Sequence, residues 1–364
     1  MTTFDDTLLD DPVRLAEADT ESRLRSAAMS GAQVRASAEI ARELDLRSRL
    51  DVGRPRALVL VGRQGIGRAA TRVIANMLSP GCPVPIVTCD VVPSWVGALD
   101  VVFAYTADPG DEELAASLDR AGRYGAAVVL TAPPDGPVAA SIAGHGLVIS
   151  PQLSGAIPES FTSALITGLL TVSALDLLSV DADLVADQLD AEAERNHLGH
   201  ESFVNPAKSL ALRWVDRTPL LWGLDPVAGA VAGYAAHVLA AEAAVVADAA
   251  EYRHAVTRVA LHRAAVNEHT GANIFADPDD PDVSPEPARR LRLLLLAIRT
   301  SAAAGVVRRS AHEVLPEAEV LDMADELGVA EPALAAVLAL RMEMAALYLG
   351  LAAGTVGRYR PVQA

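Results

Sequence analysis

The stretch ALVLVGRQGIGRAATRVIANML, residues 57–78, decides the fold of this 364-residue chain. Its first six residues, 57–62, are apolar and end in glycine, as a buried strand does. A short turn of glycines and polar residues follows, and a helix with apolar residues at helical spacing comes after it. A buried strand, a glycine turn and a helix in this order are typical of the opening unit of a parallel α/β sheet.

The same alternation continues toward the carboxyl end. Strands are expected at 84–88, 99–106, 126–132 and 147–150, and helices at 111–125, 138–146 and 160–178. Strands that alternate with helices of about 10–15 residues predict a parallel, doubly wound sheet. Such a sheet binds ligands at the carboxyl ends of its strands.

A second α/β pattern begins at TPLLWG, residues 218–223. After it we expect a helix over 226–250, a partly extended segment at 256–266, a helix at 288–303, a strand running into a turn at 305–314, and a last helix ending near Leu351. The predicted organisation is an N-terminal helical segment 1–50, a first α/β subdomain 51–178, a helical connector 179–217, and a second subdomain 218–364 with C-terminal helices.

Composition excludes several classes of function. The formal net charge of −17 disfavours broad binding of nucleic acids or anionic membranes, since both need a basic surface. Cys82 and Cys89 are too few for a disulfide scaffold or a four-cysteine zinc site. The acidic N-terminus lacks the pattern of a signal peptide, and the longest apolar stretch, 226–250, is interrupted by glycine and charge. We therefore expect a cytoplasmic protein that binds neither nucleic acid nor membrane.

Three segments, in order along the chain, resemble the bifunctional phosphoglucose/phosphomannose isomerases, which are built from sugar-isomerase (SIS) modules. They are FAYTADPGDEELAASLDRAGRYGAAVVLTA (103–132), NPAKSLALRW (205–214) followed by TPLLWG, and MEMAALYLGLAAGT (342–355). The resemblance spans nearly the whole chain, and a divergent branch labelled TobH-like is also similar. It implies an α/β fold of two SIS-type, doubly wound, flavodoxin-like subdomains with extra N-terminal and C-terminal helices.

The resemblance also implies a chemistry. Family members form homodimers and interconvert glucose or mannose 6-phosphate with fructose 6-phosphate. They move a proton between C1 and C2 through an enediolate, which requires a carboxylate base, a group that opens the ring and a phosphate cradle. This reaction needs no metal and no cofactor, so a sugar phosphate is the small-molecule partner that the resemblance implies.

The glycine turn is the first candidate site. Gly62, Gly65 and Gly67 lie between a strand and a helix, where backbone can approach a ligand and the helix N-terminus favours an anion. Arg63 and Arg68 are positioned to add charge-assisted hydrogen bonds to a phosphate or sugar oxygen. The other interpretation is a tight strand–helix turn that binds nothing.

The stretch that the resemblance equates with the phosphate turn, residues 104–113, departs from the family pattern. There, serine and threonine hydroxyls hold the phosphate, whereas here only Thr106 keeps a hydroxyl in the expected region. Asp108 and Asp111 place carboxylates where a dianion should lie. Two unit charges about 4 Å apart repel by roughly 4 kcal/mol at an effective dielectric of 20. The stretch also fits an acid-capped helix that binds no phosphate.

A second departure concerns the turn before the helix at 160–178. The family carries a Gln-Pro-Arg-like turn there, with the arginine facing the substrate. Gln152 and Pro158 are similar to two of its residues, but Glu159 stands where arginine is expected. The resemblance therefore assigns Gln152 to the substrate site and leaves that site with one positive group fewer.

Glu242 is the candidate catalytic base, because it matches the position of the family's catalytic glutamate. Its alanine and valine neighbours would raise the pKa of its carboxyl, as a general base near neutral pH needs. The alternatives are a surface glutamate or one paired with arginine in the core. His254 is the nearest match to the family's ring-opening histidine, and His262 and His269 are alternatives.

Two functions remain open at this stage. One is an aldose–ketose isomerase; the other is a non-catalytic protein that senses a sugar phosphate or nucleotide sugar, or a partner protein in mannose metabolism. The lost hydroxyls, the lost arginine and the acidic charge favour the second. A nicotinamide-binding Rossmann fold is disfavoured, because the glycine spacing differs from G-x-G-x-x-G and only Asp90 follows the next strand as a candidate ribose ligand.

Overall fold

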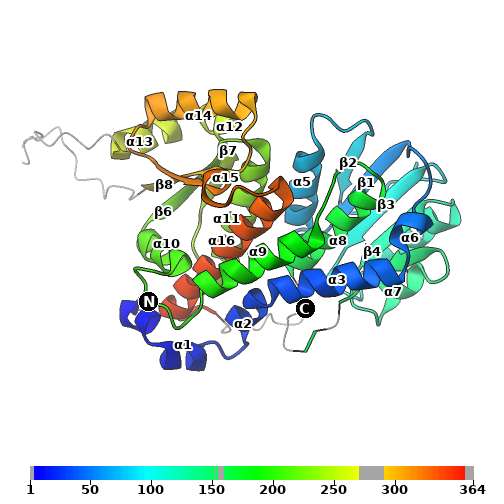
Figure 1. Ribbon diagram of the computed structural model, residues 1–364, viewed down its shortest axis with the longest axis horizontal. Coiled ribbons are helices and arrows are strands. Elements are labelled where there is room, and N and C mark those ends of the chain that lie inside the picture. The colour runs from blue at the N-terminus through cyan, green and yellow to red at the C-terminus, as the bar shows by residue number, and fades with distance from the viewer. Residues whose placement is uncertain (1–3, 152, 155–159, 270–290, 357–364) are drawn as a thin grey trace, which may run out of the picture. The chain divides into compact units, whose positions relative to one another are not determined.

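The computed structural model describes residues 4–151, 153–154, 160–269 and 291–356, and the chain divides into two compact units. The first unit is Ser22–Glu194; the second unit is Met1–Glu21 together with Arg195–Ala364. Each unit is built on one parallel sheet with helices around it (Figure 1). The α/β fold with two parallel sheets, expected from the alternating pattern, is therefore confirmed.

The sheet of the first unit has the strand order β2-β1-β3-β4-β5, with all neighbours parallel. Its strands are β1 (Ala57–Gly62), β2 (Ile86–Cys89), β3 (Asp100–Tyr105), β4 (Ala127–Thr131) and β5 (Gly146–Val148). This is the flavodoxin-like order, in which the direction of winding reverses between β1 and β3. A crevice is expected at that switch point, beyond the carboxyl ends of the two strands.

Helices cover both faces of this sheet. They are α2 (Arg23–Ala28), α3 (Ser30–Glu43), α4 (Leu46–Arg49), α5 (Ile66–Leu78), α6 (Glu112–Arg123), α7 (Pro137–Ser141), α8 (Phe161–Ala174) and α9 (Ala182–Arg195). On one face, alternate strand residues such as Val59 and Val102 form a core with Leu118 of α6. On the other face, α8 packs against α5. Because both faces are covered, β1 and β3 are buried at every residue, as a parallel sheet between two helical layers requires.

The sheet of the second unit repeats this order with four strands, β7-β6-β8-β9, again all parallel. The strands are β6 (Thr218–Gly223), β7 (Asp248–Glu251), β8 (Leu291–Ala297) and β9 (Glu319–Asp322). β6 and β8 therefore occupy the places that β1 and β3 occupy in the first unit. The second unit has its own switch point, between β6 and β8.

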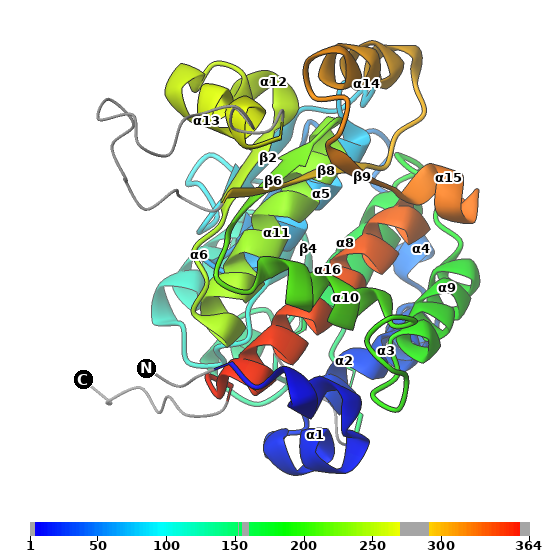
Figure 2. The ribbon, with the colours of Figure 1, turned by 90° about the vertical axis from the view of Figure 1, so that its left-hand side faces the viewer.

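The helical elements of the second unit are η1 (Asp6–Asp10), α1 (Pro12–Ala18), α10 (Pro206–Trp214), α11 (Pro226–Ala243), α12 (Tyr252–Ala255), α13 (Val259–His269), α14 (Ala302–Val314), α15 (Met323–Leu327) and α16 (Glu331–Ala353). On one sheet face, Trp222 and Leu295 form a core with Tyr252 and Val307. α11 and α16 run side by side (Figure 2). α16 is long and apolar enough to span a membrane, but 94% of its most apolar window is buried, which identifies a core helix.

Two helix boundaries in the second half differ from the expectation. The helix expected over 226–250 ends at Ala243, and residues 248–251 form strand β7. The segment 256–266, expected to be partly extended, lies largely in helix α13. β7 has the sequence DAAE, which has no local preference for a strand, so sheet pairing with β6 decided the first case.

Two further segments, β8 and α14, differ in type from the prediction. Within the expected helix 288–303, residues 291–297 form strand β8, and the expected strand at 305–314 lies in α14. The run LRLLLLA is rich in leucine, a strong helix former, but it has no polar face. A seven-residue apolar run that is buried at nearly every position fits the interior strand of a parallel sheet.

Candidate functional site

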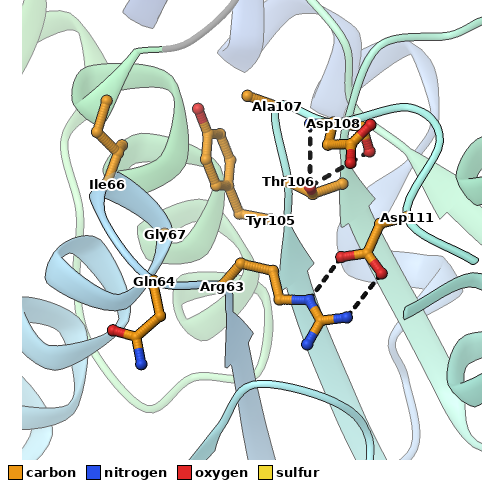
Figure 3. A pocket seen from close by; sticks show the side chains of 9 residues that line it. All are labelled: Arg63, Gln64, Ile66, Gly67, Tyr105, Thr106, Ala107, Asp108 and Asp111. Atoms are coloured by element: carbon orange, nitrogen blue, oxygen red, sulfur yellow. Dashed lines mark hydrogen bonds and ion pairs between the residues drawn. The ribbon is translucent and has the colours of Figure 1, made fainter. Parts of the chain in front are cut away.

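A pocket of about 390 Å³ lies at the carboxyl ends of β1 and β3, at the switch point of the first unit (Figure 3). Two loops supply its walls: the β1–α5 turn and the β3–α6 loop. Its lining residues are Arg63, Gln64, Ile66, Gly67, Tyr105, Thr106, Ala107, Asp108 and Asp111. Residues that are about 40 positions apart in the sequence thus meet because β1 and β3 are neighbours in the sheet.

The first turn of α5 forms one wall, and glycines allow it to do so. Gly65, the residue before the helix, has φ of 89°, a conformation that other residues rarely adopt. A Cβ at Gly62 would lie 2.3 Å from the carbonyl oxygen of Gly67, so these two glycines let the strand end approach the helix. In the part of the chain that the structure describes, no side chain caps α5. The N–H group of Arg68 donates to the backbone oxygen of Arg63 at 2.8 Å, so the N–H groups of Ile66 and Gly67 are the donors of this turn that an anion in the pocket can use.

Arg63 extends across the pocket toward Asp111 (Figure 3). Its Nε and Nη2 donate to the two carboxylate oxygens of Asp111 at 2.5 and 2.6 Å, and Nη2 also donates to Glu113 at 2.8 Å. The hydrogen bond from Arg63 lowers the pKa of the Asp111 carboxyl below its usual 3.8, and the same bond raises the pKa of Arg63. Arg63 thus lies at the predicted place, but its charge is already compensated.

Arg68 points to a different neighbour. It forms an ion pair with Asp90, the residue that follows β2, and both side chains are about one-third exposed. Arg68 is not among the residues that line the β1/β3 pocket. This ion pair also occupies the carboxylate that a nicotinamide-binding fold would use for a ribose.

Thr106 and Asp108 shape the opposite wall. Thr106 is buried, and its hydroxyl accepts a hydrogen bond from the backbone N–H of Asp108 at 3.1 Å. The Asp108 carboxylate accepts from the backbone N–H of Gly110 at 2.8 Å, and Asp111 caps α6 by accepting from Leu114 at 2.9 Å. The acid-capped helix expected at this stretch is therefore present, within a loop that also lines a pocket.

The candidate catalytic residues both lie in the second unit. Glu242 is in the last turn of α11, where its backbone oxygen accepts from the Thr355 hydroxyl at 2.5 Å. His254 is exposed in α12, directly after β7. The chain runs from Glu242 through β7 to His254, so the two residues lie beyond opposite ends of this strand, which is roughly 13 Å long. Within one chain, the fold does not bring them together.

One predicted site residue, Gln152, and one buried cation, Lys208, remain. Gln152 lies outside the described residues. Lys208 is fully buried and donates from Nζ to three backbone oxygens: those of Leu9, Leu198 (2.8 Å) and His200 (2.6 Å). Burial lowers the pKa of its ammonium group. Lys208 joins the N-terminal segment to the loop before α10, and it is structural.

Four lining residues were not anticipated from the sequence: Gln64, Ile66, Tyr105 and Ala107. Tyr105 is the last residue of β3, and its hydroxyl accepts from the backbone N–H of Ser160 at 3.1 Å. The signal that was available is positional, because each residue follows or ends a strand at the switch point. The pairing of Arg63 with Asp111 could be found only by placing β1 beside β3.

Comparisons with known proteins agree on the fold. No protein-family model matches the chain, and no curated protein matches it. Among solved structures, tagatose-6-phosphate ketose/aldose isomerase from Escherichia coli aligns with a TM-score of 0.61 and 11% identity, covering 92% of this chain and 94% of that one. The C-terminal domain of glucosamine-fructose-6-phosphate aminotransferase from Francisella tularensis gives 0.56 and 10%, covering 92% and 95%.

A hypothetical protein from Thermus thermophilus aligns with a TM-score of 0.65 at 14% identity, covering 95% of this chain and 89% of that one. These alignments extend over both units, so the likeness includes the tandem arrangement of two α/β modules. At such low identity the comparison establishes fold and not activity. The chain therefore shares its fold with these solved structures.

Proposed function

We propose that this protein binds a sugar phosphate in the β1/β3 pocket and does not catalyse aldose–ketose isomerisation. The observation that carries the proposal is the pocket itself: an uncapped helix N-terminus, Arg63 and Thr106 converge at the switch point. These groups are suited to an anion and to hydroxyl groups. Two of the structures similar to this chain bear the names of enzymes of hexose 6-phosphates.

The absence of turnover is proposed from the state of the charged groups. Arg63 pairs with Asp111 and Glu113, and Arg68 pairs with Asp90, so both arginines are engaged. Proton transfer to and from the sugar requires an acid or base within about 3 Å of the reacting atoms. Glu242 and His254 lie beyond opposite ends of strand β7, so within a single chain these two residues cannot act together as the base and the ring-opening group.

The alternative is an active isomerase with Glu242 as the base. It is favoured by the alignment of nearly the full chain with a ketose/aldose isomerase. Under this alternative the protein is a homodimer, and the partner chain supplies the ring-opening group that Glu242 lacks within its own chain.

A binding experiment and a turnover experiment separate the two. Calorimetry with glucose 6-phosphate, mannose 6-phosphate and fructose 6-phosphate is expected to detect binding, which Arg63→Met weakens. Coupled assays with the same sugars are expected to show no turnover. Turnover that disappears in Glu242→Gln would establish the isomerase instead. No binding of any of the three ligands at millimolar concentration would refute both.

A further inference from the structure

We propose that Asp111 and Glu113 compete with the phosphate of the ligand for Arg63, and thereby set the affinity of the β1/β3 pocket. This inference rests on the proposed function, because it concerns the same site. It assigns to these two acids a role in ligand selection that the glycine turn and the helix N-terminus do not have.

The geometry of the contact supports competition. A guanidinium binds a carboxylate and a phosphate through the same fork of parallel N–H groups. Asp111 occupies that fork with both oxygens, at 2.5 and 2.6 Å, and Glu113 accepts from Nη2 at 2.8 Å. A phosphate that binds through this Nε/Nη2 fork of Arg63 must therefore replace at least one carboxylate.

The two carboxylates differ in how easily they can leave. The side chain of Asp111 is 12% exposed and is fixed by its cap to Leu114, whereas the side chain of Glu113 is 70% exposed. Glu113 can turn into solvent when a ligand arrives. Asp111 stays beside Arg63, so its negative charge continues to oppose a phosphate.

The charges around the pocket extend this argument to ligand class. Arg63 and Asp111 neutralise each other, and Asp108 adds a further carboxylate to the lining. An unphosphorylated sugar meets no penalty from these acids, while a phosphate dianion meets repulsion from each. The two acids thus lower the affinity of the pocket for a phosphate, and removal of Asp111's charge should raise that affinity.

The test compares three variants that each remove one acid in the same turn. Asp111→Asn removes the charge and keeps an oxygen that caps α6, since asparagine is as good an N-cap as aspartate. Glu113→Gln removes the exposed partner. Glu112→Gln is the matched control, because Glu112 is exposed, neighbours Glu113, and is not an ion-pair partner of Arg63 among the described residues.

Calorimetry with glucose 6-phosphate and with glucose is the measurement. We expect Asp111→Asn to bind glucose 6-phosphate about 10-fold more tightly than the unaltered protein, a change of about 1.4 kcal/mol. Glu113→Gln should gain about 2-fold, since exposed pairs are weak. Glu112→Gln should change nothing, and the affinity for glucose should be the same in all four proteins.

The outcomes separate the two proposals. If the unaltered protein and Asp111→Asn bind glucose 6-phosphate equally, competition is wrong and the proposed function stands. An equal gain in Glu112→Gln would also overturn it, by showing general charge repulsion. If no variant binds glucose 6-phosphate, the proposed function itself fails. Circular dichroism and a melting curve of each variant establish that α6 and the fold are intact.

Discussion

The two switch points of this protein have the same strand order, but the first lines a pocket and the second is filled by a buried carboxylate. In the first unit, β1 ends at Gly62 and the loop that follows lines a pocket. In the second unit, β6 ends at Gly223, and the residue two positions later is Asp225, which is only 2% exposed. Its Oδ1 accepts from the backbone N–H groups of Val227 and Ala228 at 3.0 and 2.9 Å. Its Oδ2 accepts from those of Ile298 and Arg299 at 2.8 and 3.0 Å.

The difference shows how a fold can keep or close a ligand site with few residues. At the β6/β8 switch point, the protein's own carboxylate takes the helix N–H groups of α11, which an anion would otherwise use. At the β1/β3 switch point, α5 has no side-chain cap, and the carboxylate of Asp111 binds an arginine instead. Asp225 therefore serves structure, and the first unit retains the groups that can bind a ligand.

The largest expected effect comes from removing the carboxylate that closes the second switch point. Asp225→Ala leaves four backbone N–H groups without this acceptor, three of them buried and that of Arg299 partly buried, and should lower the free energy of unfolding by about 4 kcal/mol. Removal of a carboxylate from the wall of the first pocket, Asp108→Ala, takes away one exposed hydrogen bond and should cost less than about 0.5 kcal/mol. Urea unfolding of both variants measures the difference.

Asp225→Asn is the control for charge, since it keeps a side chain of the same shape. It should lie between the unaltered protein and Asp225→Ala, because an amide can accept from only part of the four donors. Equal losses for Asp225→Ala and Asp108→Ala would contradict the assignment of structural and ligand-binding roles to the two switch points.

The next effect tests what the two switch points share. A Cβ at Gly62 would lie 2.3 Å from the oxygen of Gly67, and one at Gly223 would lie 2.1 Å from the nitrogen of Gly229. Backbone cannot yield as a side chain can, so Gly62→Ala and Gly223→Ala should each cost about 3 kcal/mol in unfolding experiments. Gly81→Ala, where nothing lies within 4 Å of the added Cβ, is the matched control. If either Gly62→Ala or Gly223→Ala left the free energy of unfolding unchanged, the two strand ends would not be equivalent.

The sequence predicted the parts of this comparison that depend on local pattern. The strand 57–62, the glycine turn and the helix after it are all present, because a continuous apolar run closed by glycine has few other uses. TPLLWG likewise forms β6. The fold class followed from this alternation, since strands separated by helices pair in parallel.

Long-range pairing accounts for what the sequence could not provide. The run LRLLLLA favours helix by propensity, and only its place between β6 and β9 makes it a strand. The ion-pair partner of Arg63 could not be predicted from the sequence for the same reason, because Asp111 is 48 residues away along the chain. Asp108 and Asp111 were both expected to repel a phosphate, but Arg63 compensates the charge of Asp111. Which groups of the candidate site act on a ligand stays a prediction.

The smallest expected effect on the free energy of unfolding distinguishes the carboxylate of Asp111, which binds an arginine, from that of Asp225, which binds backbone amides. Arg63 lowers the pKa of Asp111 below 3.8, so its folded-state pKa lies below its unfolded-state value. Such a group adds stability above its unfolded pKa and loses that contribution as the pH falls through its folded pKa. The unaltered protein should therefore exceed Asp111→Asn in unfolding free energy by about 1 kcal/mol at pH 5–7. The gap should close progressively below about pH 4.

Urea unfolding from pH 7 to pH 3 measures the gap, and repeating it in 1 M salt tests its origin, because salt screens a partly exposed ion pair. The Arg63 side chain is 31% exposed, so the gap should shrink in salt. The loss in Asp225→Ala should not shrink, because three of its four hydrogen bonds are to buried backbone groups and the fourth is to a partly buried one. A gap for Asp111 that is independent of both pH and salt would mean that its cap to α6, and not Arg63, is the contact that stabilises the first switch point.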